Sequence, residues 1–459
     1  MTENKQNFLW GNSVSSMQTE GGWNEGGKGL SVYDIRPATE NASDWHFAND
    51  NYHKFDEDFD LIQDLGMNCY RIQTSWSRLV PEGDGAFNEE GFRYYHKVID
   101  ALLERGIKPM ICLYHFDMPL SLAERFNGFV SKEVKDAFIR YAKRVVDEFS
   151  DKVKYWITFN EQNLYHVSEA FKISGYLEGD KTEEELYQIL HNIMVCHASV
   201  DTYIHERTDC KIGGMLAYSE VYPATCNPRD ILAARKIDEF TNYTLLDAFV
   251  GKGYSKEMMK YVANKEIDMN ILPGELEIIE KQSSDFISFS YYASSTVSAE
   301  NINFDKDSPN YYGQIGHKAN PFIDSTEWGW QIDALGLRDV LNKMYQRYRV
   351  PLFILENGIG VREEWDGVNP IQDDYRIKYH EDHLRAMYQA IEQDGVEVIG
   401  YLGWGLIDIL SSQGDMEKRY GLVYVNRGNH DLRDMKRIPK KSYNWFKEVI
   451  RTNGAIIRR

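Results

Sequence analysis

Eight short apolar runs recur along this chain, and each of them is bounded by polar residues. The runs begin at Phe8 (FLWGNSV), Cys69 (CYRIQT), Pro109 (PMICLYH), Tyr155 (YWITFN), Lys211 (KIGGMLA), Asp285 (DFISFSYY), Pro351 (PLFILEN) and Val398 (VIGYLGW). Runs of this length are typical of buried β-strands when turn or loop residues bound them on both sides. The pattern therefore predicts eight strands.

Between these runs the apolar residues recur at spacings of three and four, which is typical of amphipathic helices. The spacing is clearest in residues 92–106, 138–150 and 185–206, and the first of these segments ends in Gly106, a residue that suits a helix C-terminus. Strands that alternate with helices predict βαβ units and a parallel sheet. Eight units without a linker favour one (β/α)8 barrel over residues 1–459 rather than a doubly wound sheet.

The chain is longer than a usual barrel, so we expect the excess to lie in extended βα loops. Residues 299–328 form the clearest candidate, because they contain many polar and turn-forming residues and lack a sustained apolar pattern. Active sites of such barrels lie at the C-terminal ends of the strands. The chemistry should therefore be found where the eight apolar runs end.

Charge and cysteine content narrow the class of protein further. The net charge of -19 argues against binding to nucleic acid or to an anionic membrane surface. No stretch of 18 apolar residues is present, and the first residues lack the pattern of a secretory signal. Five cysteines at scattered positions, none in a C-x-x-C pair, are typical of a reduced protein. We therefore expect a cytoplasmic protein without a transmembrane helix.

Polar, charged and aromatic side chains are concentrated at the ends of the predicted strands. In chain order they are Gln18, Glu20, Arg71, His115, Asn160, Glu161, Tyr291, Glu356, Asn357 and Trp404. Glu161 and Glu356 each follow an apolar strand directly, so both carboxyl groups should be partly buried. Two such groups on opposing strands could flank a glycosidic bond, one as an acid and one as a base or nucleophile. From spacing alone, both could equally be surface residues.

The chain resembles glycoside hydrolase family 1 from end to end. The resemblance rests on five motifs in order: FLWGNSVSSMQTEGG from Phe8, YRIQTSWSRLVPEG from Tyr70, YHFDMP from Tyr114, TFNE from Thr158 and ILENG from Ile354. It implies that Glu161 is the general acid–base and Glu356 the nucleophile. It further implies hydrogen bonds to the sugar from Gln18, His115 and Asn160, support of Glu356 by Arg71 and Tyr291, and a floor under the sugar from Trp404. No metal or organic cofactor is implied.

The segment after Trp404 differs from that of the family's neutral β-glucosidases, in which it reads roughly W-S-x-x-D-N-F-E-W. Here it reads WGLIDILSS, so Ser411 replaces a glutamate that would repel a phosphate group. Lys418 and Tyr420 follow, and with Ser411 they resemble the phosphate clamp of the 6-phospho-β-glycosidase branch. Ser412 replaces a tryptophan found in phosphogalactosidases, which favours glucose over galactose.

We therefore expect a retaining 6-phospho-β-glucosidase whose partner is a small phosphorylated β-glycoside, disaccharide or aryl, and not a nucleic acid or a membrane. A 6-phospho-β-galactosidase and a neutral β-glucosidase are the alternative enzymes. A sugar-phosphate sensor on the same barrel is the non-enzymatic alternative, but a sensor needs neither Glu161 nor Glu356. Trp330 could stack on the leaving group or could belong to the core.

Overall fold

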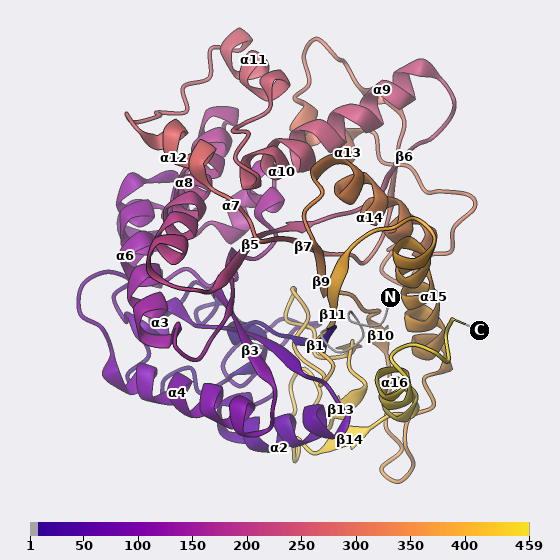
Figure 1. The fold of residues 1–459 in the computed structure, drawn as a ribbon. Coiled ribbons are helices and arrows are strands. Elements are labelled where there is room, and N and C mark those ends of the chain that lie inside the picture. The colour runs from indigo at the N-terminus through magenta and orange to yellow at the C-terminus, as the bar shows by residue number, and fades with distance from the viewer. Residues whose placement is uncertain (1–7, 459) are drawn as a thin grey trace.

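The computed structural model describes residues 8–458, and its centre is a closed barrel of eight parallel strands (Figure 1). The strands are β1 (Leu9–Ser13), β2 (Cys69–Gln73), β3 (Lys108–Tyr114), β4 (Tyr155–Phe159), β5 (Lys211–Ala217), β7 (Phe286–Ser290), β9 (Leu352–Glu356) and β11 (Val398–Trp404). They follow the order β1-β11-β9-β7-β5-β4-β3-β2 around the barrel. All eight predicted strands are present, which confirms the (β/α)8 fold.

Helices surround the barrel on its outer side (Figure 1). The longer ones are α2 (Asn51–Asp64), α4 (Glu89–Glu104), α6 (Lys132–Phe149), α8 (Glu183–Arg207), α14 (Ala334–Tyr348), α15 (Asp374–Glu392) and α16 (Lys441–Arg451). The three helices predicted from spacing are α4, α6 and α8. In α4 the Asn88 side chain accepts a hydrogen bond from the first turn, and Gly106 follows the last turn at φ 72°. These caps explain why the apolar pattern becomes a helix between those residues.

Side chains alternate between the inside and the outside of the barrel, as the pleat of a strand requires. The inner cluster is formed by Leu9, Cys69, Met110, Cys112, Ile157, Met215, Phe286, Phe353, Leu355 and Leu402. Intervening residues, such as Tyr70 on β2 and Ile287 on β7, pack into the outer core with the helices. A residue's position on its strand therefore decides whether it can reach the barrel axis.

A β-bulge interrupts this alternation on β9. Phe289 of β7 pairs with Ile354, but the next residue, Ser290, pairs with Glu356, so Leu355 has no partner in the register. Leu355 packs in the inner cluster. Without the bulge, Glu356 would point outward, and with it Glu356 faces the barrel mouth, which is a common use of bulges beside active sites.

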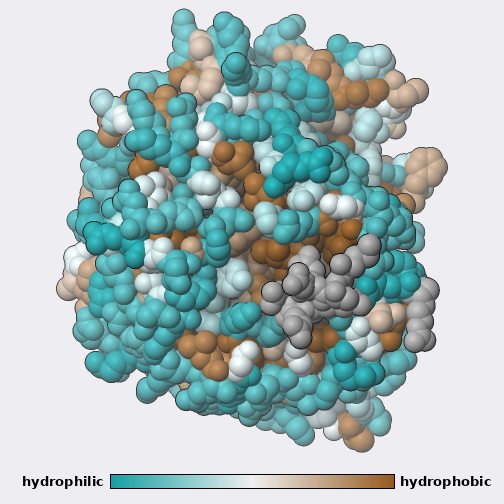
Figure 2. Space-filling view, viewed as in Figure 1, coloured by the Kyte–Doolittle hydropathy of each residue, from teal (hydrophilic) through white to brown (hydrophobic). Residues whose placement is uncertain are grey.

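Loops and short elements extend the C-terminal end of the barrel. The long loop predicted over 299–328 contains η5 (Ala299–Asn301), η6 (Pro309–Tyr311) and α13 (Tyr312–Ile315). Two residues of β10 (Val361–Arg362) pair with β12 (Lys418–Arg419) in an antiparallel ladder. Hydrophilic residues dominate the face seen in Figure 2, and apolar residues gather near its centre. Within residues 8–458, no helix is long and apolar enough to cross a membrane.

Candidate active site

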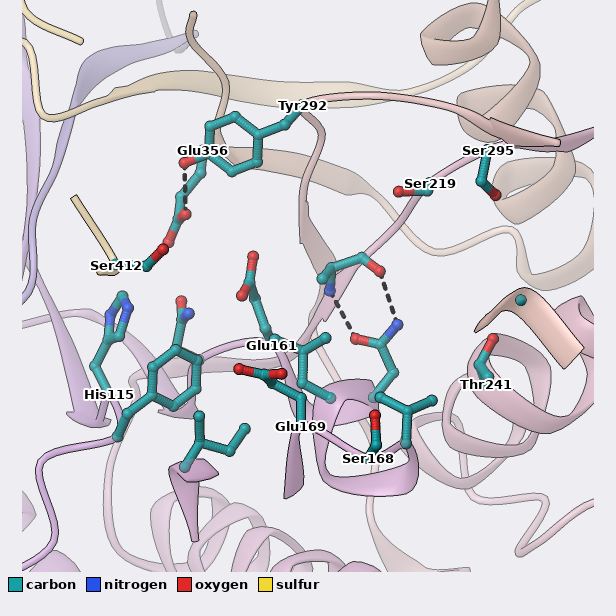
Figure 3. Close-up of a pocket in the computed structure, with 18 of the residues that line it drawn as sticks. His115, Glu161, Ser168, Glu169, Ser219, Thr241, Tyr292, Ser295, Glu356 and Ser412 are labelled. Atoms are coloured by element: carbon teal, nitrogen blue, oxygen red, sulfur yellow. Dashed lines mark hydrogen bonds between the residues drawn. The ribbon is translucent and has the colours of Figure 1, made fainter. Parts of the chain in front are cut away.

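A cavity of about 600 Å³ opens at the C-terminal ends of the barrel strands. The resemblance assigns a role to eleven residues other than Ser412. Seven of them line this cavity: Gln18, His115, Asn160, Glu161, Glu356, Trp404 and Tyr420. Figure 3 shows the carboxyl groups of Glu161 and Glu356 pointing into the same space. The surface alternative for these two glutamates is therefore wrong.

Glu356 is held by two donors from other segments of the barrel. Arg71 of β2 forms an ion pair with Glu356 Oε1, and the Tyr292 hydroxyl donates a hydrogen bond to Oε2 at 2.8 Å. Arg71 also donates to Asn160 Oδ1 at 3.1 Å, so one guanidinium orients two residues of the cavity. Burial raises the pKa of Glu356, while Arg71 and Tyr292 act in the opposite direction. These two contacts favour the ionised form that a nucleophile needs.

Glu161 has a different environment. Burial, followed by the negative charge of Glu356, raises the pKa of Glu161 to about 8. Ser290 of β7 donates a hydrogen bond to Glu161 Oε1 and lowers that pKa in part. The backbone at Glu161 is left-handed, with φ 47°, a conformation that is uncommon for a side-chain-bearing residue and recurs at functional sites. Glu161 is therefore the carboxyl group that keeps its proton near neutral pH.

The tyrosine that supports Glu356 is Tyr292, and our expectation for Tyr291 is wrong. Tyr291 is fully buried in the outer core, where its hydroxyl donates to the Asp333 carbonyl at 2.7 Å. The alternation along β7 explains the difference, because Phe286 packs inside the barrel and Ser290 and Tyr292 follow at even spacing. That period of two was visible in the sequence and would have identified Tyr292.

The residues expected to bind the sugar are held in place by their neighbours. Gln18 accepts a hydrogen bond from Ser15 at 2.6 Å and donates one to the Leu410 carbonyl at 2.8 Å. His115 stacks against Trp404 with ring centroids 5.5 Å apart. Burial, and then the charge of Arg71, hold the pKa of His115 well below its ordinary value, so its imidazole is neutral. A neutral imidazole can donate from one nitrogen and accept at the other, which suits sugar hydroxyls.

The residues of the expected phosphate clamp lie at one edge of the cavity. Tyr420 lines it, and the Lys418 ammonium lies 5.5 Å from the centre of the Tyr420 ring. Ser411 is buried, and its Oγ accepts backbone hydrogen bonds from Gln413 and Asp415. Ser411 and Lys418 are not lining residues of the cavity itself. The structure thus brings Lys418 and Tyr420 together, with Ser411 in the adjoining turn.

Lys418 is almost completely buried, at 7% exposure, between two tryptophan rings. Its ammonium lies 3.9 Å from the centre of Trp330 and 4.6 Å from that of Trp328. Burial lowers the pKa of Lys418 to about 8, although Asp415 and Glu327 oppose this shift. Sequence reasoning did not find this arrangement, because the two segments are about 90 residues apart along the chain.

The lining also contains Glu169, which no sequence pattern identified; Figure 3 shows its carboxyl group next to Glu161. Ser412 also lines the cavity. Among residues 8–458, no group of three or more His, Cys, Asp or Glu side chains could hold a metal ion.

The whole chain is similar to known glycosidases. The aryl-phospho-beta-D-glucosidase BglH of Bacillus subtilis (strain 168) is 39% identical over 98% of this chain and 97% of its own length. A 6-phospho-beta-glucosidase of Clostridium longisporum is 38% identical over 99% and 98% of the two chains. The solved beta-glucosidase of Thermotoga maritima in complex with glucoimidazole has a TM-score of 0.86 at 29% identity, covering 98% and 99%.

The family model described as glycosyl hydrolase family 1 matches residues 2–455. This match covers both candidate glutamates, the segment of Ser290 and Tyr292 that contacts them, and the strand β12 that carries Lys418. The resemblance that the five motifs predicted is thereby confirmed, and the chain belongs to glycosyl hydrolase family 1.

Proposed function

We propose that this chain is a retaining 6-phospho-β-glucosidase, which hydrolyses 6-phosphorylated β-glucosides to glucose 6-phosphate and an aglycone. The observation that carries the proposal is the unequal environment of two carboxyl groups in one cavity. Glu356 is ion-paired to Arg71, whereas Glu161 is half-buried beside that negative charge and has a raised pKa. Unequal proton affinity is what a double displacement by two carboxyl groups requires.

In this mechanism Glu356 attacks the anomeric carbon while Glu161 protonates the leaving oxygen. The glycosyl–enzyme bond is then broken by water, from which Glu161, now a carboxylate, removes a proton. Arg71 and Tyr292 hold Glu356 in place by their hydrogen bonds to its two oxygens. We expect the two carboxyl groups to act at a separation of about 5–5.5 Å, with retention of the β configuration.

The phosphate would bind at the edge of the cavity where Lys418 and Tyr420 meet, with Ser411 as a further donor. Lys418 would supply a charge-assisted hydrogen bond, which is stronger than one from a neutral hydroxyl. The lining of the cavity contains three glutamates and no Lys or Arg. Lys418 at its edge would therefore supply the positive charge that an anionic substrate needs. The names of the relatives support this choice of substrate.

Glucose is favoured over galactose because a small residue, Ser412, stands where phosphogalactosidases carry a tryptophan. A 6-phospho-β-galactosidase and a neutral β-glucosidase remain the alternative activities. The cytoplasmic location is part of this proposal, and the five free cysteines support it.

One comparison tests the function: turnover of a nitrophenyl β-glucoside, its 6-phosphate and the corresponding β-galactoside 6-phosphate under identical conditions. We expect the glucoside 6-phosphate to have the highest kcat/KM. A higher value for the unphosphorylated glucoside or for the galactoside 6-phosphate would favour the respective alternative. NMR of the first-formed sugar should show the β anomer, and an α anomer would exclude a retaining mechanism.

A further inference from the structure

We propose that Trp328 and Trp330 form an aromatic cage that positions Lys418, and that these tryptophans thereby determine selectivity for the phosphorylated substrate. The inference rests on the proposed function, because it assigns to the cage the task of presenting a cation to the 6-phosphate. It concerns two residues of the loop before α14 that do not belong to the predicted clamp of Ser411, Lys418 and Tyr420.

The cage is defined by three aromatic rings around one ammonium group. The Lys418 Nζ lies 3.9 Å from the ring centre of Trp330, 4.6 Å from that of Trp328 and 5.5 Å from that of Tyr420. A cation within about 6 Å of an aromatic centre is attracted by the negative face of the ring, and more strongly when water is excluded. Lys418 meets both conditions, since the residue is buried.

The neighbouring cation, Arg362, shows what is unusual about Lys418. The two residues pair across the β10–β12 ladder. Arg362 contacts three carboxylates, Glu327 at 3.5 Å, Asp415 at 3.8 Å and Glu417 at 3.4 Å. Lys418 forms no ion pair within 4 Å among the residues that the structure describes. Arg362 also lies 5.8 Å from the Trp328 ring, but carboxylates supply its ion pairs, whereas the close neighbours of the Lys418 ammonium are aromatic rings.

This difference suits a cation that must bind an anionic ligand. A carboxylate partner would occupy the ammonium N–H groups and would also repel a phosphate that carries close to two negative charges. An aromatic face restrains the ammonium without neutralising its charge. It also places no oxygen or nitrogen acceptor on the ammonium N–H groups. The cage thus keeps Lys418 in a fixed position while its charge and its donors stay available.

The cage also contacts the catalytic side of the cavity through one of its two tryptophans. Trp330 lines the cavity and packs against Tyr292, with ring centroids 5.6 Å apart, and Tyr292 donates to Glu356. Trp328 does not line this cavity. Trp328 is therefore the better residue to test. Because its ring also lies 5.8 Å from the guanidinium of Arg362, a Lys418→Met background is needed to show that its effect passes through Lys418.

The experiment measures kcat/KM of Trp328→Leu on a nitrophenyl β-glucoside and on its 6-phosphate. We expect the value on the 6-phosphate to fall about 2- to 30-fold, the range for loss of one cation–π contact. The value on the unphosphorylated glucoside should stay within about twofold of wild type. Trp330→Leu should lower both values, because Trp330 also lines the cavity and contacts Tyr292.

Two controls separate the cage from general damage to the fold. Trp365→Leu removes a tryptophan whose ring lies 5.9 Å from another ammonium, that of Lys436, and should leave the substrate ratio unchanged. In a Lys418→Met background, Trp328→Leu should have no further effect on the ratio, since the group it positions is absent. Melting temperatures of all variants should be compared, so that unfolding is not mistaken for loss of selectivity.

The outcomes distinguish the two proposals. If wild type prefers the 6-phosphate and Trp328→Leu retains that preference in full, the cage is wrong and the proposed function stands. The cage is also wrong if Trp328→Leu changes the ratio equally with and without Lys418. If wild type shows no preference for the 6-phosphate, the proposed function fails, and the assigned role of the cage fails with it.

Discussion

Two buried cations serve the cavity in opposite ways. Arg71 lies inside the barrel, fully buried, and is ion-paired to Glu356 with a further hydrogen bond to Asn160. Lys418 lies at the edge of the cavity, nearly as buried, and contacts aromatic rings in place of carboxylates. Both are cations in a chain of net charge -19. Arg71 has a carboxylate of the protein as its counter-charge, whereas Lys418 has no ion pair within 4 Å among the described residues.

The difference follows from what each cation has to do. Arg71 must orient and keep ionised a group of the enzyme, so its partner is permanent, and the rigid guanidinium fork suits a carboxylate. Lys418, in our proposal, must bind a group of the substrate, so its partner comes and goes. Removing one of these cations should therefore damage the protein in a different way from removing the other, and the following variants test that contrast.

The largest effect is expected for Glu356→Gln, which removes the partner of Arg71. Turnover of every substrate should fall to the background rate, because no glycosyl–enzyme bond can form. Glu161→Gln is the matched control and should retain more activity on nitrophenyl than on alkyl 6-phosphoglucosides, since an acidic leaving group needs little protonation. Steady-state assays on both substrates measure this, and equal losses would show that the two roles are misassigned.

Arg71→Met should be the next most damaging change. It leaves the buried Glu356 carboxylate without its cation, and breaking a buried pair in this way costs about 3–5 kcal/mol of stability. The loss should be largest where Glu356 is ionised, because a protonated carboxyl group does not need the guanidinium. Urea unfolding at two pH values measures it, and an unchanged free energy of unfolding would contradict the importance of this pair.

Lys418→Met should act on selectivity. A hydrogen bond from a charged donor contributes about 1.5–3 kcal/mol, so kcat/KM on the 6-phosphate should fall by roughly 10- to 150-fold. Activity on the unphosphorylated glucoside should be almost unchanged, because that substrate lacks the group that Lys418 would bind. If both activities fall together, Lys418 has a structural role and the phosphate clamp is wrong.

The smallest effect concerns Ser290, whose hydroxyl donates to Glu161. This hydrogen bond lowers the pKa of Glu161, which burial otherwise raises, to the net value of about 8. The protonated form of Glu161 acts as the acid, and it is lost as the pH rises through that pKa. In Ser290→Ala the pKa should be higher, so the alkaline limb of the kcat/KM profile should move upward by about one pH unit. A limb that stays in place, or moves down, would show that Ser290 does not act on Glu161.

The sequence was sufficient for features that depend on local periodicity. All eight strands were predictable because each is a short apolar run with polar ends, and the α4 boundary at Gly106 followed from a residue type that suits a left-handed backbone. Glu161 and Glu356 were predictable for a related reason. Each follows its strand directly, and the parallel arrangement brings those ends together at one face of the barrel.

What the sequence did not reveal depends on contacts across long distances in the chain or on irregular backbone. Tyr291 and Tyr292 are adjacent in the sequence, and the pleat of β7 decides which of the two faces Glu356. The bulge at Leu355 and the left-handed Glu161 have no simple sequence signal, since both are imposed by pairing with neighbouring segments. The rings around Lys418 come from a loop whose path only the fold determines.

Because of the environment of Lys418, a substitution there that raises the stability of the protein is expected to lower its substrate specificity. A buried ammonium without a counter-charge lowers the stability of the empty enzyme, and an apolar side chain of similar length at this position should be neutral or stabilising. A directed-evolution screen that scores heat resistance alone would then accept Lys418→Met as an improvement, although the variant had lost its discrimination. Libraries built on this barrel should therefore be scored on paired substrates from the first round.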